Sequence, residues 1–499
     1  MSTLPLAHAG DPPHTVAPDE AGPPAPVGRR AILAWFLFDW AAQPVNTLIT
    51  TFVIPPFFVG VVVPRFLEAI AASDPASAAA TMTADDMEAV GQAWWGWAAA
   101  LAGIAVAILS PILGAIADAA GRRKPWIAAF GALLVLGSFA LWFAEPGAPG
   151  AVIIALIGFA IATLGDEFAT VFNNAMMPRL VAADRLGRLS GSGWAMGYFG
   201  GMLALVILLA FFVANADETT TFFGFAPLFG LEPATYEGVR ATGPLTALWF
   251  VVFVIPMFLY VPDTPRLMPV RAAVRMGLAT LRKTLTGLRG EYNMLRFLIA
   301  RMIYADGLAG LFAFGGVYAA STFDWGTTET LLFGVVVIVA AIPGAFLGGR
   351  LDDRLGSKAV ILGSLTVLVV ASLLAVSIDA DSILFGIASA PPLADDGLFA
   401  STGEQLYLIL GAAIGAVAGP LQAASRALLV RLAPRPRITQ FFGLYALTGK
   451  LTTFVAALAV ALLTTLSGSQ RIGISVLVVF FVAGGVLMLG VRERQTGRA

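Results

Sequence analysis

The chain of 499 residues is 58% hydrophobic and 12% charged, and its formal net charge is -1. Soluble proteins carry about 25% charged residues, so this composition excludes most soluble enzymes, disordered proteins and nucleic-acid-binding proteins and predicts a chain that lies largely in a bilayer. The chain has no cysteine, and its two histidines, His8 and His14, stand near the N-terminus. Thiol chemistry, a histidine metal site and an intramembrane histidine relay are therefore excluded. We expect no enzymatic activity, no cofactor, no metal and no nucleic-acid partner.

The first 28 residues contain seven prolines and few large apolar side chains. Because they lack the basic start and apolar core of a signal peptide, we expect a disordered tail. Twelve apolar segments follow, and a helix needs about 20 such residues to cross a bilayer. They lie at 31–63, 91–117, 125–144, 151–178, 190–214, 243–261, 294–321, 329–349, 358–378, 405–430, 440–466 and 470–491. None alternates like a barrel strand. The sequence therefore predicts an all-α membrane protein with twelve transmembrane helices in two six-helix halves.

Two departures from a simple row of helices are expected. The first segment is long enough to tilt, or to bend at Pro44 and Pro55-Pro56. Between the sixth and seventh segments, apolar residues recur every three or four positions beside several arginines, at Val270, Val274, Leu278, Leu281, Leu285 and Leu288. This spacing is typical of an amphipathic helix on a membrane surface. A linker between the halves is the favoured interpretation, and a regulatory or lipid-sensing role is the alternative.

The predicted units are a tail (1–28), an N-terminal bundle (29–261), a cytoplasmic amphipathic linker (262–293), a C-terminal bundle (294–492) and a short tail (493–499). Basic residues divide unequally between the two sides of the membrane: 24 fall on one side and three on the other, at Arg65, Arg240 and Arg471. Loops rich in arginine and lysine stay in the cytoplasm. Both termini are therefore predicted to be cytoplasmic, in a bacterial inner membrane.

The chain contains an internal repeat. One loop carries Gly114, Asp118, Gly121, Arg122, Arg123 and Lys124, and a second carries Gly349, Asp353, Gly356 and Lys358. The segment that begins at Arg179 resembles the one that begins at Arg431, and Asp39 in the first span corresponds to Asp306 in the seventh. The sequence thus indicates a tandem duplication of six spans. Such repeats are typical of secondary transporters, whose substrates bind near the middle of the membrane between the repeats.

The repeated loop pattern, G-x3-D-x2-G followed by basic residues, resembles the signature of the major facilitator superfamily. A narrower resemblance rests on FDWAAQPVNTLITTFVIPPFF (38–58), FNNAMMP (172–178), SGSGWAMGYFGG (190–201), YADG (304–307), GPLQAASRALL (419–429) and FFGLYALTGK (441–450). These segments resemble the vacuole-effluxer family, which includes an autophagy-linked amino-acid effluxer. The resemblance implies a major facilitator fold, transport of amino acids or similar small metabolites outward, and a gating role for the repeated loops.

Polar and ionisable residues inside the spans are the candidate substrate and ion pathway, because a charge near the bilayer centre is costly unless it is paired or faces water. On the first span, Asp39, Gln43 and Asn46 share one face with Thr50. The remaining candidates are Asp166, Glu167, Asn173, Asn174, Tyr304, Asp306, Gln422, Ser425, Arg426 and Lys450. Their position favours a shared aqueous cavity, and hydrogen bonding that only holds the bundle together is the alternative.

A mechanism follows as a hypothesis. Lys450 or Arg426 holds a substrate carboxylate or pairs with an embedded aspartate, while Asp306 or Asp39 takes up and releases a proton; sodium is the other candidate ion. Arg426 lies close enough to the cytoplasmic face for its side chain to extend to water. Asp118 and Asp353 are expected to accept hydrogen bonds from a helix N-terminus or a guanidinium group of a neighbouring helix. By resemblance, these contacts stabilise one state of the cytoplasmic gate.

The expected partners are a small-molecule substrate, a proton or sodium ion and membrane lipids, with the chain acting as a monomer. Two other functions remain open. A cation-coupled sugar symporter would use the neutral amide groups for sugar hydroxyls, whereas Lys450 suits a carboxylate substrate better. A non-transporting membrane sensor with a transporter fold is the second alternative.

Overall fold

A computed structural model describes residues 27–214, 219–287, 290–379, 382–389 and 398–493. Within these residues, twelve helical segments are long and apolar enough to cross a membrane, which confirms the predicted all-α architecture. The prediction of a disordered tail concerns residues that lie outside this part of the chain, apart from 27 and 28.

The first span is a helical path that contains two π-helical segments. It comprises α1 (Arg29–Pro44), η2 (Val45–Phe52), α2 (Ile54–Phe57), η3 (Phe58–Val62) and α3 (Val63–Ser73). Both η2 and η3 are π-helices. The first begins directly after Pro44, a residue that has no backbone N–H to donate, so the expected change of path at this proline takes the form of a wider helical turn.

Five further spans complete the N-terminal half, and six form the C-terminal half. The N-terminal five are α4 (Ala84–Ala120), α5 (Lys124–Ala140), α6 (Ala151–Asn174), α7 (Leu186–Phe211) and α9 (Thr242–Tyr260). The C-terminal six are α11 (Tyr292–Phe323), α12 (Thr327–Leu355), α13 (Ser357–Val376), α14 (Thr402–Leu432), α15 (Ile438–Lys450) continued by α16 (Thr453–Ser467), and α17 (Gln470–Leu489).

Shorter elements connect the spans. They are η4 (Ala78–Thr81), η5 (Leu141–Phe143), η6 (Met177–Arg179), η7 (Ala183–Arg185), η8 (Leu228–Gly230), η9 (Pro233–Thr235), α8 (Glu237–Arg240), the linker helix α10 (Val270–Gly287) and η11 (Arg435–Arg437). Two short antiparallel strands, β1 (Ser382–Ile383) and β2 (Ala388–Ser389), lie in the loop between α13 and α14.

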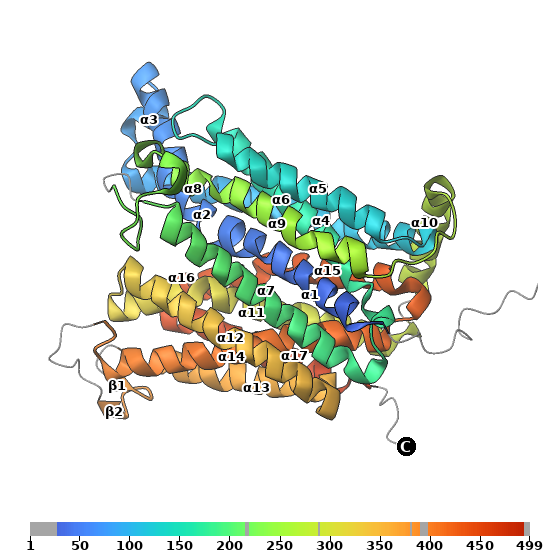
Figure 1. The fold of residues 1–499 in the computed structure, drawn as a ribbon. Coiled ribbons are helices and arrows are strands. Elements are labelled where there is room, and N and C mark those ends of the chain that lie inside the picture. Colours follow the sequence, from blue (N-terminus) through green and yellow to red (C-terminus); the bar gives the residue numbers. More distant parts are fainter. Residues whose placement is uncertain (1–26, 215–218, 288–289, 380–381, 390–397, 494–499) are drawn as a thin grey trace, which may run out of the picture.

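The two halves meet mainly where α4 packs on α15 and where α7 packs on α12 and α14. Figure 1 shows α10 at one end of the bundle, and α3 and the strand pair at the other. We call the α10 end the basic end, since the loops there carry the repeated cations Arg122, Arg123, Lys124 and Lys358. The other end is called the acidic end.

The linker helix packs on the protein through a face that only partly coincides with the predicted apolar stripe. Of the predicted apolar stripe, Leu281 is buried against the protein, whereas Val270, Val274, Leu278 and Leu285 are exposed; Leu288 lies outside the described residues. The buried face is formed instead by small residues and Leu281, namely Ala273, Gly277, Leu281 and Thr284. Small side chains prevail there because α10 lies very close to the backbone of α4 around Ala115 and Ile116.

Candidate transport site and contacts between the halves

A cluster of polar side chains joins the halves near the middle of the membrane; we call it the central cluster (Asn46, Asp166, Glu167 and Lys450). The amide Nδ2 of Asn46 donates a hydrogen bond to Oδ2 of Asp166 at 3.0 Å. The ammonium group of Lys450, at the end of α15, forms an ion pair with Oε1 of Glu167 on α6 at 2.6 Å. The side chains of Lys450 and Glu167 are 32% and 24% exposed. This ion pair therefore bridges the two halves and is accessible to a polar ligand.

The π-helix η2 determines where Asn46 points. π-Helices are rare and are frequently found at functional sites. Here the segment carries Asn46 and Thr50, both exposed although they lie in the middle of a span. The hydroxyl of Thr51 donates to the carbonyl oxygen of Asn46 at 2.8 Å. A tilt, or a bend at Pro44, was expected from the sequence, but no sequence pattern indicated the π-helix.

Arg426 on α14 forms a second contact between the halves, nearer the basic end. Its Nη1 lies 3.2 Å from Oδ2 of Asp39 and 2.9 Å from Oδ1 of Asn174. Its Nε and Nη2 donate to the hydroxyl and carbonyl oxygens of Ser190, at 2.8 and 2.7 Å. The guanidinium also lies over the rings of Trp35 and Trp194. The prediction that this side chain extends to water is therefore wrong: Arg426 is 4% exposed, because all of these partners in the N-terminal half surround it.

The other embedded candidates are placed as follows. Tyr304 and Ser425 share a buried hydrogen bond of 2.7 Å within the C-terminal half. Asp306 is 2% exposed, and its Oδ1 has no hydrogen-bond partner among the described residues. Asn173 is fully buried. The indole N–H of Trp35 donates to the backbone carbonyl oxygen of Asn173 at 3.1 Å. Gln43 and Gln422 are partly buried.

At the basic end, the first copy of the repeated loop contacts the opposite half; we call these residues the Asp118 cluster (Asp118, Arg123, Asp263, Thr439 and Gln440). Oδ1 and Oδ2 of Asp118 accept the backbone N–H groups of Thr439 and Gln440, at 3.1 and 2.8 Å. These N–H groups stand in the first turn of α15, where a helix favours negative charge. Asp118 also forms an ion pair of 3.2 Å with Arg123, and Asp263 accepts the backbone N–H of Arg123 at 2.9 Å.

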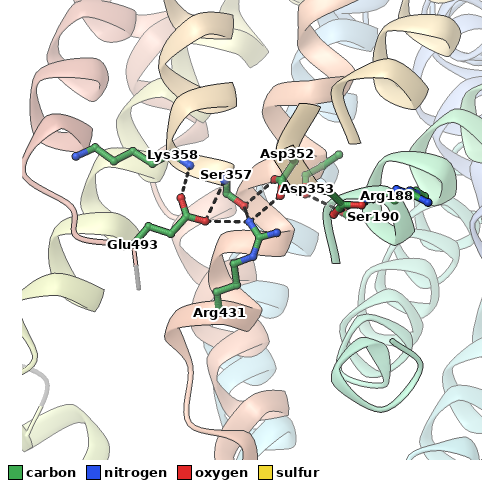
Figure 2. A network of polar contacts seen from close by, with 9 residues as sticks. Arg188, Ser190, Asp352, Asp353, Ser357, Lys358, Arg431 and Glu493 are labelled. Atoms are coloured by element: carbon green, nitrogen blue, oxygen red, sulfur yellow. Dashed lines mark hydrogen bonds and ion pairs between the residues drawn. The ribbon is translucent and has the colours of Figure 1, made fainter. Parts of the chain in front are cut away.

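The second copy forms the Asp353 cluster (Asp353 and Arg188), which Figure 2 shows together with its neighbours. Oδ1 of Asp353 accepts the backbone N–H of Arg188, in the first turn of α7, at 3.1 Å. Its other oxygen lies 3.4 Å from Nε of the same arginine, whose side chain is 58% exposed. The Asp353 carboxylate therefore holds the start of α7 as Asp118 holds the start of α15.

An internal network, not anticipated from the sequence, lies beside Asp353 (Figure 2). Arg431 forms ion pairs with Asp352 at 2.6 Å and with Glu493 at 2.9 Å, and it donates to the hydroxyl of Ser357. Glu493 accepts the backbone N–H groups of Ser357 and Lys358, at 3.0 and 2.9 Å. A sequence signal for this network exists: Asp263 and Glu493 each follow the last span of their half, and Asp352 directly precedes Asp353.

Glycines of the repeated loops permit the close contact between the halves. A Cβ atom on Gly114 would collide with the backbone of Thr439 in α15, and one on Gly349 would collide with Gly187 in α7. The chain turns sharply after each helix, at Gly121 (φ 96°) and Gly356 (φ 89°), a region of φ that L side chains rarely adopt.

Comparison with known proteins identifies the family. A sequence profile described as "Vacuole effluxer Atg22 like" matches residues 27–499. The chain belongs to this family. The vacuole-effluxer resemblance seen in the sequence is therefore confirmed.

The chain is similar in sequence to bacterial and fungal proteins. The "Uncharacterized MFS-type transporter YxiO" of Bacillus subtilis (strain 168) is 24% identical over 463 residues, which cover 93% of this chain and 95% of that protein. "Autophagy-related protein 22" of Cryptococcus neoformans var. neoformans serotype D (strain JEC21 / ATCC MYA-565) is 28% identical over 303 residues, which cover 59% of this chain and 48% of that protein.

Solved structures show that this Atg22-like chain has the fold of major facilitator superfamily proteins. The proton:xylose symporter XylE is similar with a TM-score of 0.61 and 14% identity, covering 93% of this chain and 95% of that one. The human organic anion transporter MFSD10 is similar with a TM-score of 0.61 and 14% identity, covering 92% and 99%. The chain is thus a multi-pass integral membrane protein of a transporter family, with the major facilitator fold.

Proposed function

We propose that this Atg22-like protein exports small zwitterionic metabolites, amino acids first among them, in exchange for protons. The basic end lies in the cytoplasm of a bacterial cell, and both termini are on that side. The single observation that carries this proposal is the Lys450–Glu167 ion pair of 2.6 Å between the halves. Transport by alternating access requires the halves to move relative to each other around such a site.

The chemistry of that pair suits a zwitterion. An amino acid presents a carboxylate to Lys450 and an ammonium group to Glu167, so both charges keep a partner while the link between the halves is broken. A neutral solute would leave two opposite charges partly desolvated when the halves separate, at a cost that grows with burial. Asp166 lies next to Glu167 along α6, and its buried Oδ1 has no hydrogen-bond partner among the described residues.

We infer that the structure is in an outward-facing state. Within the described residues, the hydrogen bonds and ion pairs that join the two halves lie at the basic end or at the central cluster, and none lies nearer the acidic end. The Asp118 and Asp353 clusters and Arg426 then act as contacts that close the cytoplasmic side. Opening that side requires all of them to separate.

Asp306 is the proposed proton carrier. Asp39, the other candidate, is engaged by Arg426 in this state, whereas Asp306 is buried without a hydrogen bond to its Oδ1 in the described part of the chain. Replacing Asp306 with Asn removes the titratable group and keeps the side-chain shape. We expect Asp306→Asn to retain counterflow of substrate but to lose the dependence of net flux on a pH gradient. A variant with unchanged proton dependence would contradict this assignment.

A counterflow screen in proteoliposomes tests the substrate class. Amino acids, small peptides and sugars are compared, with and without a pH gradient, for the wild type and for Lys450→Gln and Glu167→Gln. We expect amino-acid counterflow in the wild type and a loss of at least about tenfold in both variants, since one charge-assisted hydrogen bond contributes about 1.5–3 kcal/mol. Lys283→Gln, a change at an exposed lysine of α10, is the matched control and should leave counterflow unchanged.

The screen also tests the alternative of a cation-coupled sugar symporter. The neutral amides of Gln43, Asn46 and Gln422 would serve sugar hydroxyls, and two structurally similar proteins, XylE and FucP, are named as a proton:xylose and a fucose:proton symporter. Sugar counterflow that survives Lys450→Gln would favour that alternative. Absence of counterflow for every class, with correctly folded protein, would favour a non-transporting sensor.

A further inference from the structure

The linker helix α10 has three distinct faces. One face is buried and packs on α4 through Ala273, Gly277, Leu281 and Thr284. Next to it runs an exposed apolar row, Val270, Val274, Leu278 and Leu285, of which Val270 and Leu285 are each 51% exposed. One residue further round the helix, Arg271, Arg275 and Arg282 form an exposed basic row. Successive residues of a helix are about 100° apart, so the apolar row lies between the protein and the arginines.

The basic row is not neutralised by the protein. The sequence of α10 contains no acidic residue. Among the described residues, the ion pairs of the molecule do not include Arg271, Arg275 or Arg282. A row of free cations beside an exposed apolar row matches the composition of helices that lie in the surface of an anionic membrane.

The depth of α10 along the bundle fits the same environment. Gly277 faces Ala115 and Ile116 of α4, whose last residue is Ala120. At about 1.5 Å per residue, the centre of α10 lies roughly 6–8 Å before the end of this membrane-crossing helix. It therefore lies beside the last turns of α4. Interfacial helices bury their apolar face about 5–10 Å into the boundary between headgroups and acyl chains.

We propose that α10 binds the cytoplasmic leaflet of an anionic bilayer. Val274, Leu278 and Leu285 enter the boundary between headgroups and acyl chains, and Arg271, Arg275 and Arg282 bind the anionic headgroups. This inference does not depend on the substrate or on the direction of transport. Each arginine near an anionic surface is expected to strengthen binding roughly fivefold.

The absence of cysteine from the chain makes a site-specific test direct. Leu278→Cys is labelled with a fluorophore sensitive to polarity, and the full-length protein is placed in nanodiscs of phosphatidylcholine with or without phosphatidylglycerol. We expect a blue-shifted emission, and quenching by lipids brominated on the acyl chain, in the anionic discs. Both signals should weaken in pure phosphatidylcholine and in an Arg271→Gln/Arg275→Gln/Arg282→Gln variant.

Two controls keep the result interpretable. A label at Met276→Cys, an exposed position about 160° from Leu278 around α10, should stay in water in every disc. Replacing the same three arginines with lysine should restore the wild-type signal and show that charge, not folding, is responsible. The proposal is overturned if the Leu278 label remains water-exposed in anionic discs. It is also overturned if the label inserts equally well with and without anionic lipid, since a purely apolar contact would then suffice.

Discussion

The Asp118 and Asp353 clusters contact equivalent helix starts at the basic end. They differ in which residues make the contacts within a half and which make the contacts between the halves. In the N-terminal half, one carboxylate pairs with Arg123 in its own half and also accepts two backbone N–H groups of α15. In the C-terminal half, Asp352 makes the internal contacts and Asp353 makes the contact with α7. Asp352 and Asp353 together therefore make the two kinds of contact that Asp118 makes alone.

The reason lies in one loop position. Lys124 and Lys358 are equivalent, because each ammonium group donates to a carbonyl near the end of its half's last span, Phe258 and Leu489, at 2.7 Å. The position before each lysine is then Arg123 in one half and Ser357 in the other. Serine is too short and uncharged to neutralise a buried carboxylate, so Arg431 from the end of α14 supplies the cation for Asp352. The comparison shows that a repeat can keep a contact while its charges move to different residues.

Among these variants, Arg431→Gln should cause the largest change in free energy. The change should reduce the stability of the fold and not shift the gate. It leaves Asp352, which is 1% exposed, and Glu493 without their shared cation. Breaking a buried ion pair by removing one partner costs about 3–5 kcal/mol, so the free energy of unfolding in mixed micelles should fall by about that amount. Arg435→Gln, at an exposed arginine of the next loop, is the control and should change it by less than about 0.5 kcal/mol. An equally small loss for Arg431→Gln would show that the network is not needed for the fold.

Asp118→Asn should have the largest effect on the conformational equilibrium. An amide presents one oxygen and one donor group, so it loses at least one of the two hydrogen bonds to the start of α15. Because a hydrogen bond to a charged group contributes about 1.5–3 kcal/mol, the outward-facing state should lose roughly 10- to 100-fold in relative population. Spin labels at Asp184→Cys and Arg435→Cys, one in each half at the basic end, report this as a longer distance. A distribution identical to that of the parent would remove Asp118 from the gate.

Asp353→Asn should shift the same distance in the same direction, but less. The carboxylate accepts one backbone N–H from α7, and its ion pair is with a side chain that is 58% exposed. An asparagine oxygen can still accept this N–H, so an ordinary hydrogen bond of about 0.5–1.5 kcal/mol replaces a charge-assisted one of about 1.5–3 kcal/mol. We therefore expect about a 3- to 10-fold change in population. If the shift equals that of Asp118→Asn, the two clusters contribute equally and the asymmetry has no energetic consequence.

Arg188→Gln should have the smallest effect. The backbone N–H of residue 188 still reaches Asp353, and only the exposed ion pair is lost. Exposed pairs contribute about 0–1 kcal/mol, so the spin-label distance should change by less than the Asp353→Asn variant changes it. A larger change would mean that the arginine side chain, and not the start of α7, is the main partner of Asp353.

The twelve spans, the internal repeat and the family resemblance could all be predicted from the order of the amino acids. Hydropathy and helical periodicity depend on about 20 neighbouring residues, so the extent of each span could be predicted without the fold. The repeated loop pattern likewise indicated turns at Gly121 and Gly356. The polar character of the central cluster was also visible, because Asp166, Glu167 and Lys450 are charges within apolar segments.

How these charges pair depends on the packing of the helices in the folded protein. Arg426 and Asp39 are 387 residues apart, and no local pattern indicates that an arginine near a helix end turns inward to a pocket of two tryptophans and Ser190. The same holds for α10, whose periodicity predicted a helix but not which face meets α4. Pairing across the halves depends on the crossing of α4 with α15 and of α7 with α12, and that packing is set by close backbone contact at Gly114 and Gly349.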